Sequence, residues 1–384
     1  MKVDVAVVGG GPAGTACALT LCRYSDLRVV VLERGDYSAA RVGETVGPGL
    51  RPLLVYLGLW EKFIRDGHRP AHATAASWGS DEIFRQEFFF TGRGAGWHLD
   101  RRRFDRRLAG EVGEAGGTML LKCAFRSIAR ARSGGWLLAA EPKDGGQLQI
   151  TARFVIDATG RAAAVARHLE ARPEVIDQLV GVTGFIDFRE PFQDEHFALV
   201  EACAEGWWYS ACLPRRRMAV AFMTDGELVR ELDAQHVAGW RSLLAATRHT
   251  RARVEGGTQP KTLFVRPAGS QMLRPPAGDG WIAVGDAAAA FDPLSSMGIG
   301  HAVSTGMHAS LAVQGALRGD DGLLNEYARG IAKNFEQFLE IRQSFYAAER
   351  RWTEAPFWNR RQNSAGGHPG SSRPDQDVVV ALTS

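Results

Sequence analysis

The chain begins with an apolar run, Val3-Asp4-Val5-Ala6-Val7-Val8, which continues directly into Gly9-Gly10-Gly11-Pro12-Ala13-Gly14. A short run rich in valine is typical of a buried parallel strand. The glycines form a G-x-G-x-x-G pattern, and the small and apolar residues 15–21 predict a helix after it. One glycine permits a tight turn, the second leaves room for a pyrophosphate, and the third lets the helix approach the strand. This order predicts a dinucleotide site that includes Gly9, Gly11, Pro12, Ala13 and Gly14.

A second valine-rich run, residues 28–32, ends at Glu33, which lies 19 residues after Gly14. An acidic side chain at this distance accepts hydrogen bonds from the hydroxyls of an adenosine ribose. A carboxylate there favours an unphosphorylated ribose, so the sequence predicts FAD or NAD rather than NADP. The neighbouring Arg34 completes this part of the predicted cofactor site.

The composition is that of an ordinary globular protein, with 384 residues, 45% hydrophobic and 23% charged. The formal net charge of +3 is too small to indicate nucleic acid, and no apolar run approaches the length of a membrane helix. The five cysteines are scattered without a C-x-x-C pair, which predicts no metal site, no disulfide framework and a cytoplasmic location. Because the first strand begins at the N-terminus, we expect no signal peptide.

Two later stretches again combine a buried strand with a small-residue ending. Phe154-Val155-Ile156 leads into Asp157-Ala158-Thr159-Gly160, where a sheet end can approach a nucleotide closely. Another apolar run leads into Gly285-Asp286, and Asp292-Pro293 and Gly298-Ile299-Gly300 follow before a long predicted helix. The Asp286 carboxylate can accept hydrogen bonds from a ribityl chain. The backbone N–H groups at the helix start can face a partly negative flavin ring.

The segment Arg41-Val42-Gly43-Glu44 begins an irregular, glycine-rich loop that extends to Gly49. Such a loop, placed soon after the ribose strand, either crosses the middle of an extended dinucleotide or is a surface connection. Asp100 is a predicted helix N-cap. Arg101, in the first turn of that helix, either reaches a phosphate or the flavin or is exposed.

Short strands rich in aromatic residues interrupt this framework at residues 71–96 and 176–264. We therefore predict an α/β fold in which a Rossmann-like FAD-binding domain is interleaved with a mostly antiparallel β-sheet substrate domain. The FAD-binding domain would comprise residues 1–70, 97–175 and 265–352, including the C-terminal helices. Residues 353–384, rich in Gly, Ser, Pro, Asn and Gln, are predicted to be a disordered tail.

The most aromatic point is Gly206-Trp207-Trp208-Tyr209-Ser210. These side chains either line a pocket for a planar substrate or pack inside a strand. Trp208 and Tyr209 are the predicted pocket residues.

Three features together resemble the FAD-dependent monooxygenase family with the fold of para-hydroxybenzoate hydroxylase: the Gly9–Gly14 turn with Glu33, the Asp157–Gly160 strand end, and the Gly285–Gly300 region. The resemblance covers about residues 1–345. Residues 41–44, 206–208 and 292–300 are similar to a narrower branch of that family. The branch holds tryptophan-halogenase-like proteins, geranylgeranyl-reductase-like proteins, and flavoproteins that mature quinone-cofactor amine dehydrogenases and amino-acid oxidases.

The leading hypothesis is a flavin hydroxylase. In it, reduced FAD reacts with oxygen to give a C4a-hydroperoxide, which transfers OH to an electron-rich aromatic ring. The partner is either an aromatic small molecule or a tryptophan-bearing protein, the latter implied by the resemblance to the maturation flavoproteins. Because one dinucleotide fold is evident, NAD(P)H would dock transiently or another electron donor would replace it.

The hypothesis assigns roles to named residues. Glu44 is the predicted acid near the chemistry, and His301 is a second catalytic candidate. Alternatively, His301 is a helix residue whose hydrogen bonds are satisfied within the protein. The predicted cofactor-binding residues are Gly9, Gly11, Pro12, Ala13, Gly14, Glu33, Arg34, Val42, Gly43, Arg101, Gly160, Gly285, Asp286, Pro293, Gly298, Ile299 and Gly300.

Three other functions stay open. Halogenases similar to this branch carry W-x-W-x-I-P and a catalytic lysine. This chain instead has Trp207-Trp208-Tyr209-Ser210-Ala211-Cys212-Leu213-Pro214, and Lys62 is the only lysine between Glu44 and Leu99. A flavin reductase of isoprenoid double bonds would need an apolar pocket. A non-catalytic flavin-binding partner protein would hold FAD without turnover.

Overall fold

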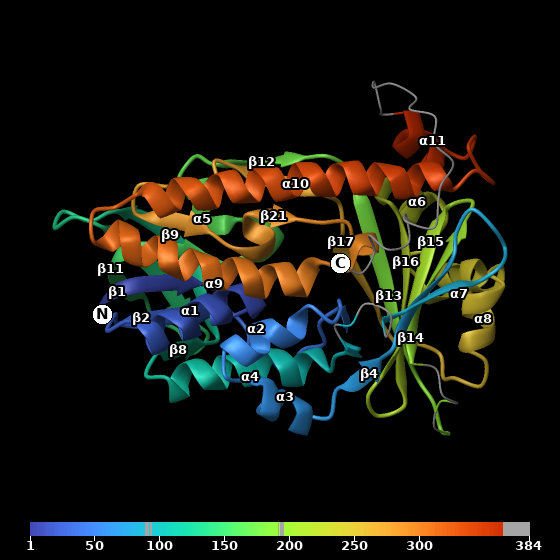
Figure 1. Ribbon diagram of the computed structural model, residues 1–384, viewed down its shortest axis with the longest axis horizontal. Coiled ribbons are helices and arrows are strands. Elements are labelled where there is room, and N and C mark those ends of the chain that lie inside the picture. Colours follow the sequence, from blue (N-terminus) through green and yellow to red (C-terminus); the bar gives the residue numbers. More distant parts are fainter. Residues whose placement is uncertain (89–91, 93, 191, 193–195, 364–384) are drawn as a thin grey trace.

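In this computed structural model, two large β-sheets lie one after the other along the long axis of the molecule, and one long helix passes over both (Figure 1). The structure describes residues 1–363 apart from 89–91, 93, 191 and 193–195. The predicted α/β class, with a Rossmann-like first sheet, is confirmed. The predicted domain boundaries stay predictions.

The first sheet has eight strands around a parallel centre. β1 (Lys2–Val8) pairs in parallel with β2 (Val29–Glu33) and with β11 (Leu148–Asp157). The central valines are fully buried, as expected of a parallel strand that is covered on both faces. The other strands are β8 (Thr118–Leu121), β9 (Cys123–Arg130), β10 (Trp136–Pro142), β19 (Ala277–Gly278) and β20 (Trp281–Ala283).

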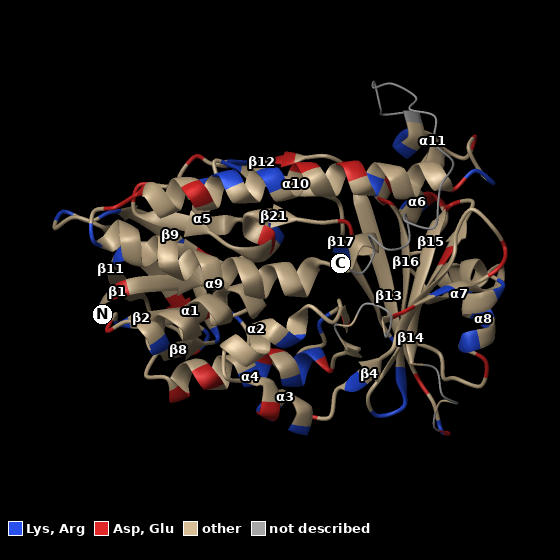
Figure 2. Cartoon of the chain, in the orientation of Figure 1, with Lys and Arg blue, Asp and Glu red and all other residues tan. Residues whose placement is uncertain are grey.

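Small residues let two helices cross closely beside this sheet. α1 (Pro12–Tyr24) begins with proline at a position where its missing N–H costs nothing. A Cβ on Gly306 of α9 (Gly298–Leu317) would lie 2.3 Å from the carbonyl oxygen of Ala13. α9 carries no Lys, Arg, Asp or Glu and is uniformly tan in Figure 2, consistent with its position between α1 and α10 (Gly322–Ala348).

Four further helices belong to this part of the described chain. α4 (Arg101–Glu114) begins after the predicted N-cap Asp100, whose side chain accepts a hydrogen bond from the Arg103 N–H. The rest are α2 (Leu50–Tyr56), α3 (Trp60–Arg65) and α5 (Ala164–His168).

The second sheet has seven strands in the order β17-β13-β16-β15-β14-β5-β6. One face packs on α7 (Val237–Ala245) through Trp240, and the opposite face turns toward the first sheet. The strands are β17 (Leu263–Pro267), β13 (Leu179–Asp187), β16 (Arg217–Asp225), β15 (Gly206–Leu213), β14 (Phe197–Cys203), β5 (Ala73–Ser77) and β6 (Phe84–Glu87).

Two three-stranded sheets connect these parts. One contains β3 (Thr45–Val46), β7 (Gly96–His98) and β4 (Arg69–Ala71), and the other contains β12 (Arg172–Val175), β18 (Gln271–Arg274) and β21 (Ala289–Ala290). The remaining helices beside the second sheet are α6 (Gly226–Glu231) and α8 (His249–Arg253).

The C-terminal segment contains a helix where the sequence predicts disorder. That prediction is wrong for the residues of α11 (Pro356–Asn363). Phe357 and Trp358 are fully buried, and the Arg361 guanidinium pairs with the Asp225 carboxylate of β16 at 2.6 Å. A few anchoring side chains therefore hold a segment whose polar composition suggested no core. Residues 364–384 lie outside the described residues.

Replacing Arg361 by methionine should destabilise the fold. Asp225 is 4% exposed and, among the described residues, would keep only the half-exposed Arg360, at 3.2 Å, as its counter-ion. We expect the free energy of unfolding, measured by denaturant titration, to fall by about 3–5 kcal/mol. Arg360→Met is the matched control and should lose less than about 1 kcal/mol. Equal losses in the two variants would contradict this assignment.

Candidate functional site

The three motif glycines after β1 serve three different purposes. Gly9 has a φ of +109°, and a Cβ there would lie 2.1 Å from the Ala158 carbonyl oxygen. A Cβ on Gly14 would lie 2.0 Å from the Gly9 carbonyl oxygen, so α1 approaches β1 only because that side chain is missing. Gly11 has an ordinary backbone conformation, and a Cβ there would meet no atom within 4 Å. Its missing side chain leaves open space before the N-terminus of α1.

Glu33 lies beside this turn. Its carboxylate accepts hydrogen bonds from the N–H groups of Gly10 at 2.9 Å and Gly35 at 2.8 Å. Arg41 contacts the same carboxylate at 3.3 Å. The neighbouring Arg34 is exposed and takes no part in these contacts.

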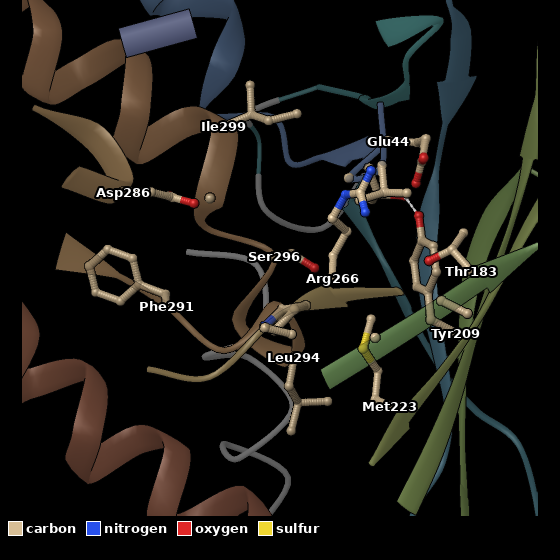
Figure 3. Close-up of a pocket in the computed structure, with 18 of the residues that line it drawn as sticks. Glu44, Thr183, Tyr209, Met223, Arg266, Asp286, Phe291, Leu294, Ser296 and Ile299 are labelled. Atoms are coloured by element: carbon tan, nitrogen blue, oxygen red, sulfur yellow. Dashed lines mark hydrogen bonds between the residues drawn. The ribbon is translucent and has the colours of Figure 1, made fainter. Parts of the chain in front are cut away.

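A cavity of about 360 Å³ extends from the glycine turn to the second sheet (Figure 3). Many of the residues predicted for the cofactor meet in its wall: Gly11, Pro12, Ala13, Val42, Gly43, Arg101, Gly160, Asp286, Pro293, Gly298 and Ile299. The structure does not bring six others to the cavity surface: Gly9, Gly14, Glu33, Arg34, Gly285 and Gly300.

This wall fits a flavin dinucleotide. A Cβ on Gly11, Gly298 or Gly300 would meet no atom within 4 Å, so the backbone is bare at both helix starts. The Asp286 side chain is 37% exposed and lies 3.7 Å from the Arg161 Nε, which leaves carboxylate oxygen free to accept further hydrogen bonds. Gly11, Gly298 and Asp286 would therefore hold FAD.

The loop that contains Val42 and Gly43 forms one wall of the cavity. Arg101 donates hydrogen bonds to both of their carbonyl oxygens, each at 2.8 Å, and pairs with Asp105 at 3.1 Å. The Arg101 side chain is only 11% exposed, so the alternative prediction that this residue is exposed is wrong. The loop crosses the site instead of serving only as a surface connection.

Glu44 is a buried carboxyl in the same wall. It is 3% exposed, and within the described part of the chain its Oε1 has no hydrogen-bond partner. Burial raises the pKa of Glu44 to about 7, although the nearby Arg101 opposes the shift. Near neutral pH both protonation states are populated, as a general acid or base requires.

A short chain of polar groups adjoins Glu44. Tyr209 lines the cavity, and its hydroxyl lies 2.5 Å from the Thr45 Oγ1 (Figure 3). The same Oγ1 lies 2.9 Å from the His98 Nδ1. Burial lowers the pKa of His98 to about 3, so its imidazole is neutral. Glu44, Thr45 and Tyr209 thus place polar atoms side by side in the cavity wall.

The prediction that Trp208 belongs to the pocket is wrong. Adjacent residues of a strand point to opposite faces of the sheet. Trp208 stacks on Phe222 of β16, with ring centroids 4.9 Å apart, on the face that packs against Trp240. Trp207 lines the cavity instead.

His301 lies in the first turn of α9 but does not line the cavity. Its ring packs edge-on against Phe291, with centroids 4.5 Å apart, and burial lowers its pKa to about 4. The structure therefore does not bring this catalytic candidate to the cavity surface.

Several cavity residues escaped the sequence reasoning. One of them is Arg161, whose only signal in the sequence was its position directly after Gly160. The Arg161 side chain donates hydrogen bonds to the carbonyl oxygens of Ala268, Gly269 and Phe291. Others come from the second sheet, where only the strand register brings them together: Gly181, Thr183, Ala221, Met223 and Arg266.

The described residues form neither a metal-binding cluster nor a membrane-spanning helix. No group of three or more His, Cys, Asp or Glu side chains in that part of the chain is placed to hold a metal ion. None of the described helices is long and apolar enough to cross a membrane.

Comparisons with known proteins also indicate that this chain binds FAD. Residues 2–340 match the family model described as an FAD binding domain. The chain is 35% identical over 361 residues to LodB of Marinomonas mediterranea, which carries the name FAD-dependent oxidoreductase; the match covers 93% of this chain and 96% of LodB. This chain therefore belongs to the FAD-binding-domain family, and it is an FAD-dependent oxidoreductase.

Solved structures show the same fold. The myxobacterial chondrochloren halogenase CndH has a TM-score of 0.86 at 21% identity, with 94% of this chain and 86% of that chain covered. The peptidyl tryptophan dihydroxylase QhpG has a TM-score of 0.74 at 24% identity, with 94% and 79% covered.

Replacing Gly11 by leucine should abolish FAD binding without unfolding the protein. The side chain would enter open space, so the fold keeps its contacts while the cofactor wall is blocked. The flavin absorbance of the purified protein measures the loss, and circular dichroism checks the fold. Gly14→Leu is the contrast and should unfold the protein, because its Cβ has no room. A full flavin spectrum in the Gly11 variant would contradict the assignment of this turn.

Replacing Glu44 by glutamine should make the stability less dependent on pH. The folded pKa of about 7 lies above the ordinary 4.5, so between these values the folded state binds more protons than the unfolded chain and loses stability as pH rises. Relative to the wild type, the variant should gain up to about 3 kcal/mol between about pH 4 and about pH 8. Denaturant unfolding at both values measures the change. A constant difference would show that Glu44 titrates normally.

Proposed function

We propose that this protein is a monooxygenase that hydroxylates an electron-rich aromatic ring, and that the ring is a tryptophan side chain of a partner protein. The observation that carries the proposal is a single cavity that joins the FAD-binding wall to the aromatic face of the second sheet. When bound, FAD supplies the redox chemistry that activates molecular oxygen. The chain itself supplies a place for the ring and a group that accepts a proton.

The face of the second sheet supports a planar substrate. Its lining is small at Gly181 of β13, Ala198 of β14 and Ala221 of β16. Two aromatic residues of β15, Trp207 and Tyr209, stand on the same face. Small residues next to aromatic ones leave a shallow space in which a ring can lie against other rings.

Glu44 supports an aromatic substitution. When a hydroxyl group joins a ring carbon, that carbon must release its proton before the ring is aromatic again. A carboxylate that is buried in the cavity wall, with a pKa of about 7, can accept this proton and later release it to water.

The alternatives have less support. No lysine is among the described residues that line the cavity, and Lys62 of α3 is engaged by Glu111 at 2.7 Å and Glu114 at 2.8 Å, which disfavours halogenation through a lysine. Binding of an isoprenoid chain would need an apolar pocket, whereas this cavity wall carries three arginine side chains among the described residues. A non-catalytic role disagrees with the oxidoreductase family.

Similarity to QhpG, described as a peptidyl tryptophan dihydroxylase, supports a protein-borne tryptophan. NAD(P)H or another two-electron donor would reduce the cofactor. The free cysteines of the described chain support a reducing compartment such as the cytoplasm.

The test uses the FAD-loaded protein, reduced without oxygen and then mixed with oxygen and a tryptophan-bearing peptide. We expect the peptide to gain the mass of one oxygen atom. Reoxidation of the flavin by oxygen, with no oxygen added to the peptide or to free aromatic compounds tested in its place, would overturn the proposal.

Glu44→Gln should lower the hydroxylation rate by about 100-fold while the FAD content stays the same. Because the base must be deprotonated, the wild-type rate should rise with pH through a midpoint near 7, and the variant should lack this step. Glu114→Gln, which changes an exposed glutamate of α4, is the control. A wild-type pH profile in the Glu44 variant would remove Glu44 from the chemistry.

A further inference from the structure

Three arginines of the described chain line the cavity, and two of them are already engaged. Arg101 pairs with Asp105 at 3.1 Å and donates to two loop carbonyls. Arg161 donates to three carbonyl oxygens and lies 3.7 Å from the Asp286 carboxylate. Both guanidinium groups are therefore occupied by contacts within the FAD-binding wall.

Arg266 differs from these two. It lies on β17, the edge strand of the second sheet, where it is exposed and paired across strands with Gly181. Within the described ranges no carboxylate lies at ion-pair distance from its guanidinium, whose one hydrogen bond goes to the carbonyl oxygen of Val265 at 2.9 Å. Among the residues that the structure describes, this cavity-lining cation is therefore left without an acidic partner.

The surroundings of Arg266 leave space for a ligand. Its cross-strand neighbour is a glycine, and Figure 3 shows its side chain between Ser296 of the flavin-side loop and Met223 and Tyr209 of the sheet. Three strand spacings, about 14 Å at the backbone, separate β17 from β15, which carries Tyr209. A long arginine side chain and an aromatic ring with a short acidic arm can bridge this distance together.

We propose that Arg266 binds an anionic group that is attached to, or lies next to, the aromatic ring of the substrate. A guanidinium offers paired donors that match a carboxylate, and such charge-assisted pairs are stronger than neutral hydrogen bonds. This inference rests on the proposed function and defines its substrate class: an electron-rich ring accompanied by a negative charge. The carboxylate comes either from a free aromatic acid or from an Asp or Glu beside the target tryptophan.

The test measures binding to the oxidised, FAD-loaded protein without turnover. Indole-3-acetate and its neutral analogue indole-3-acetamide are titrated while the flavin absorbance is recorded. The wild type should bind the acid about tenfold more tightly, which is about 1.4 kcal/mol. Arg266→Gln should remove this preference and leave the affinity for the amide unchanged, whereas Arg266→Lys should keep part of it.

Arg85→Gln is the matched control, because Arg85 lies on β6, the opposite edge strand, and does not line the cavity. It should bind as the wild type does. The acetylated, amidated dipeptides Glu-Trp and Gln-Trp are titrated in the same way. A preference for the acid only in the dipeptides assigns the anion to a partner protein, and a preference only in the free compounds assigns it to a small molecule.

Two results would overturn the inference: a wild type that binds neither acid more tightly than its neutral analogue, and an Arg266→Gln variant that keeps the preference. Since no oxygen transfer is measured, the result does not depend on whether the protein hydroxylates. An intact preference without hydroxylation would leave Arg266 as an anion-binding residue and reject the proposed reaction alone.

Discussion

The hydrogen bonds and ion pair of the buried Asp292 carboxylate connect the flavin-side wall of the cavity with the wall formed by the second sheet. Asp292 is fully buried and precedes Pro293 in the loop that faces the FAD-binding side. It accepts hydrogen bonds from the Leu294 N–H at 2.9 Å and the Tyr346 hydroxyl at 2.7 Å, and it pairs with Arg342 at 3.3 Å. The helix α10, which carries Tyr346 and Arg342, therefore holds this loop in place.

The same tyrosine also contacts the second sheet. The indole N–H of Trp207 donates to the Tyr346 hydroxyl at 3.2 Å, so one oxygen connects the second sheet with the loop. A buried carboxylate is stable only while its charge is paired, and this requirement keeps Asp292 and α10 together. The position of the flavin-side loop relative to the second sheet is thereby fixed by side chains of α10, none of which lines the cavity among the described residues. Such fixed placement is what a flavin reaction needs from its protein.

Sequence reasoning found the features whose causes are local. The strand, the glycine turn and Glu33 belong to one continuous strand–helix–strand unit, so their spacing carried the information. The choice between Trp207 and Trp208 depended on strand register, which two adjacent tryptophans cannot reveal. The Tyr346–Asp292 contact spans 54 residues, and Arg266 reaches the cavity only through the pairing of β17 with β13. Long-range packing, not local pattern, decided these placements and the burial of α11.

The most direct test of the central claim, oxygen transfer to a ring in this cavity, is the source of the oxygen atom in the product. The reduced FAD-loaded protein is supplied with a tryptophan-bearing peptide and with heavy-isotope-labelled molecular oxygen in ordinary water. A monooxygenase places the label in the peptide, as read by mass spectrometry. A hydroxylated peptide that carries oxygen from water, or a peptide left unchanged while oxygen is consumed, would contradict it.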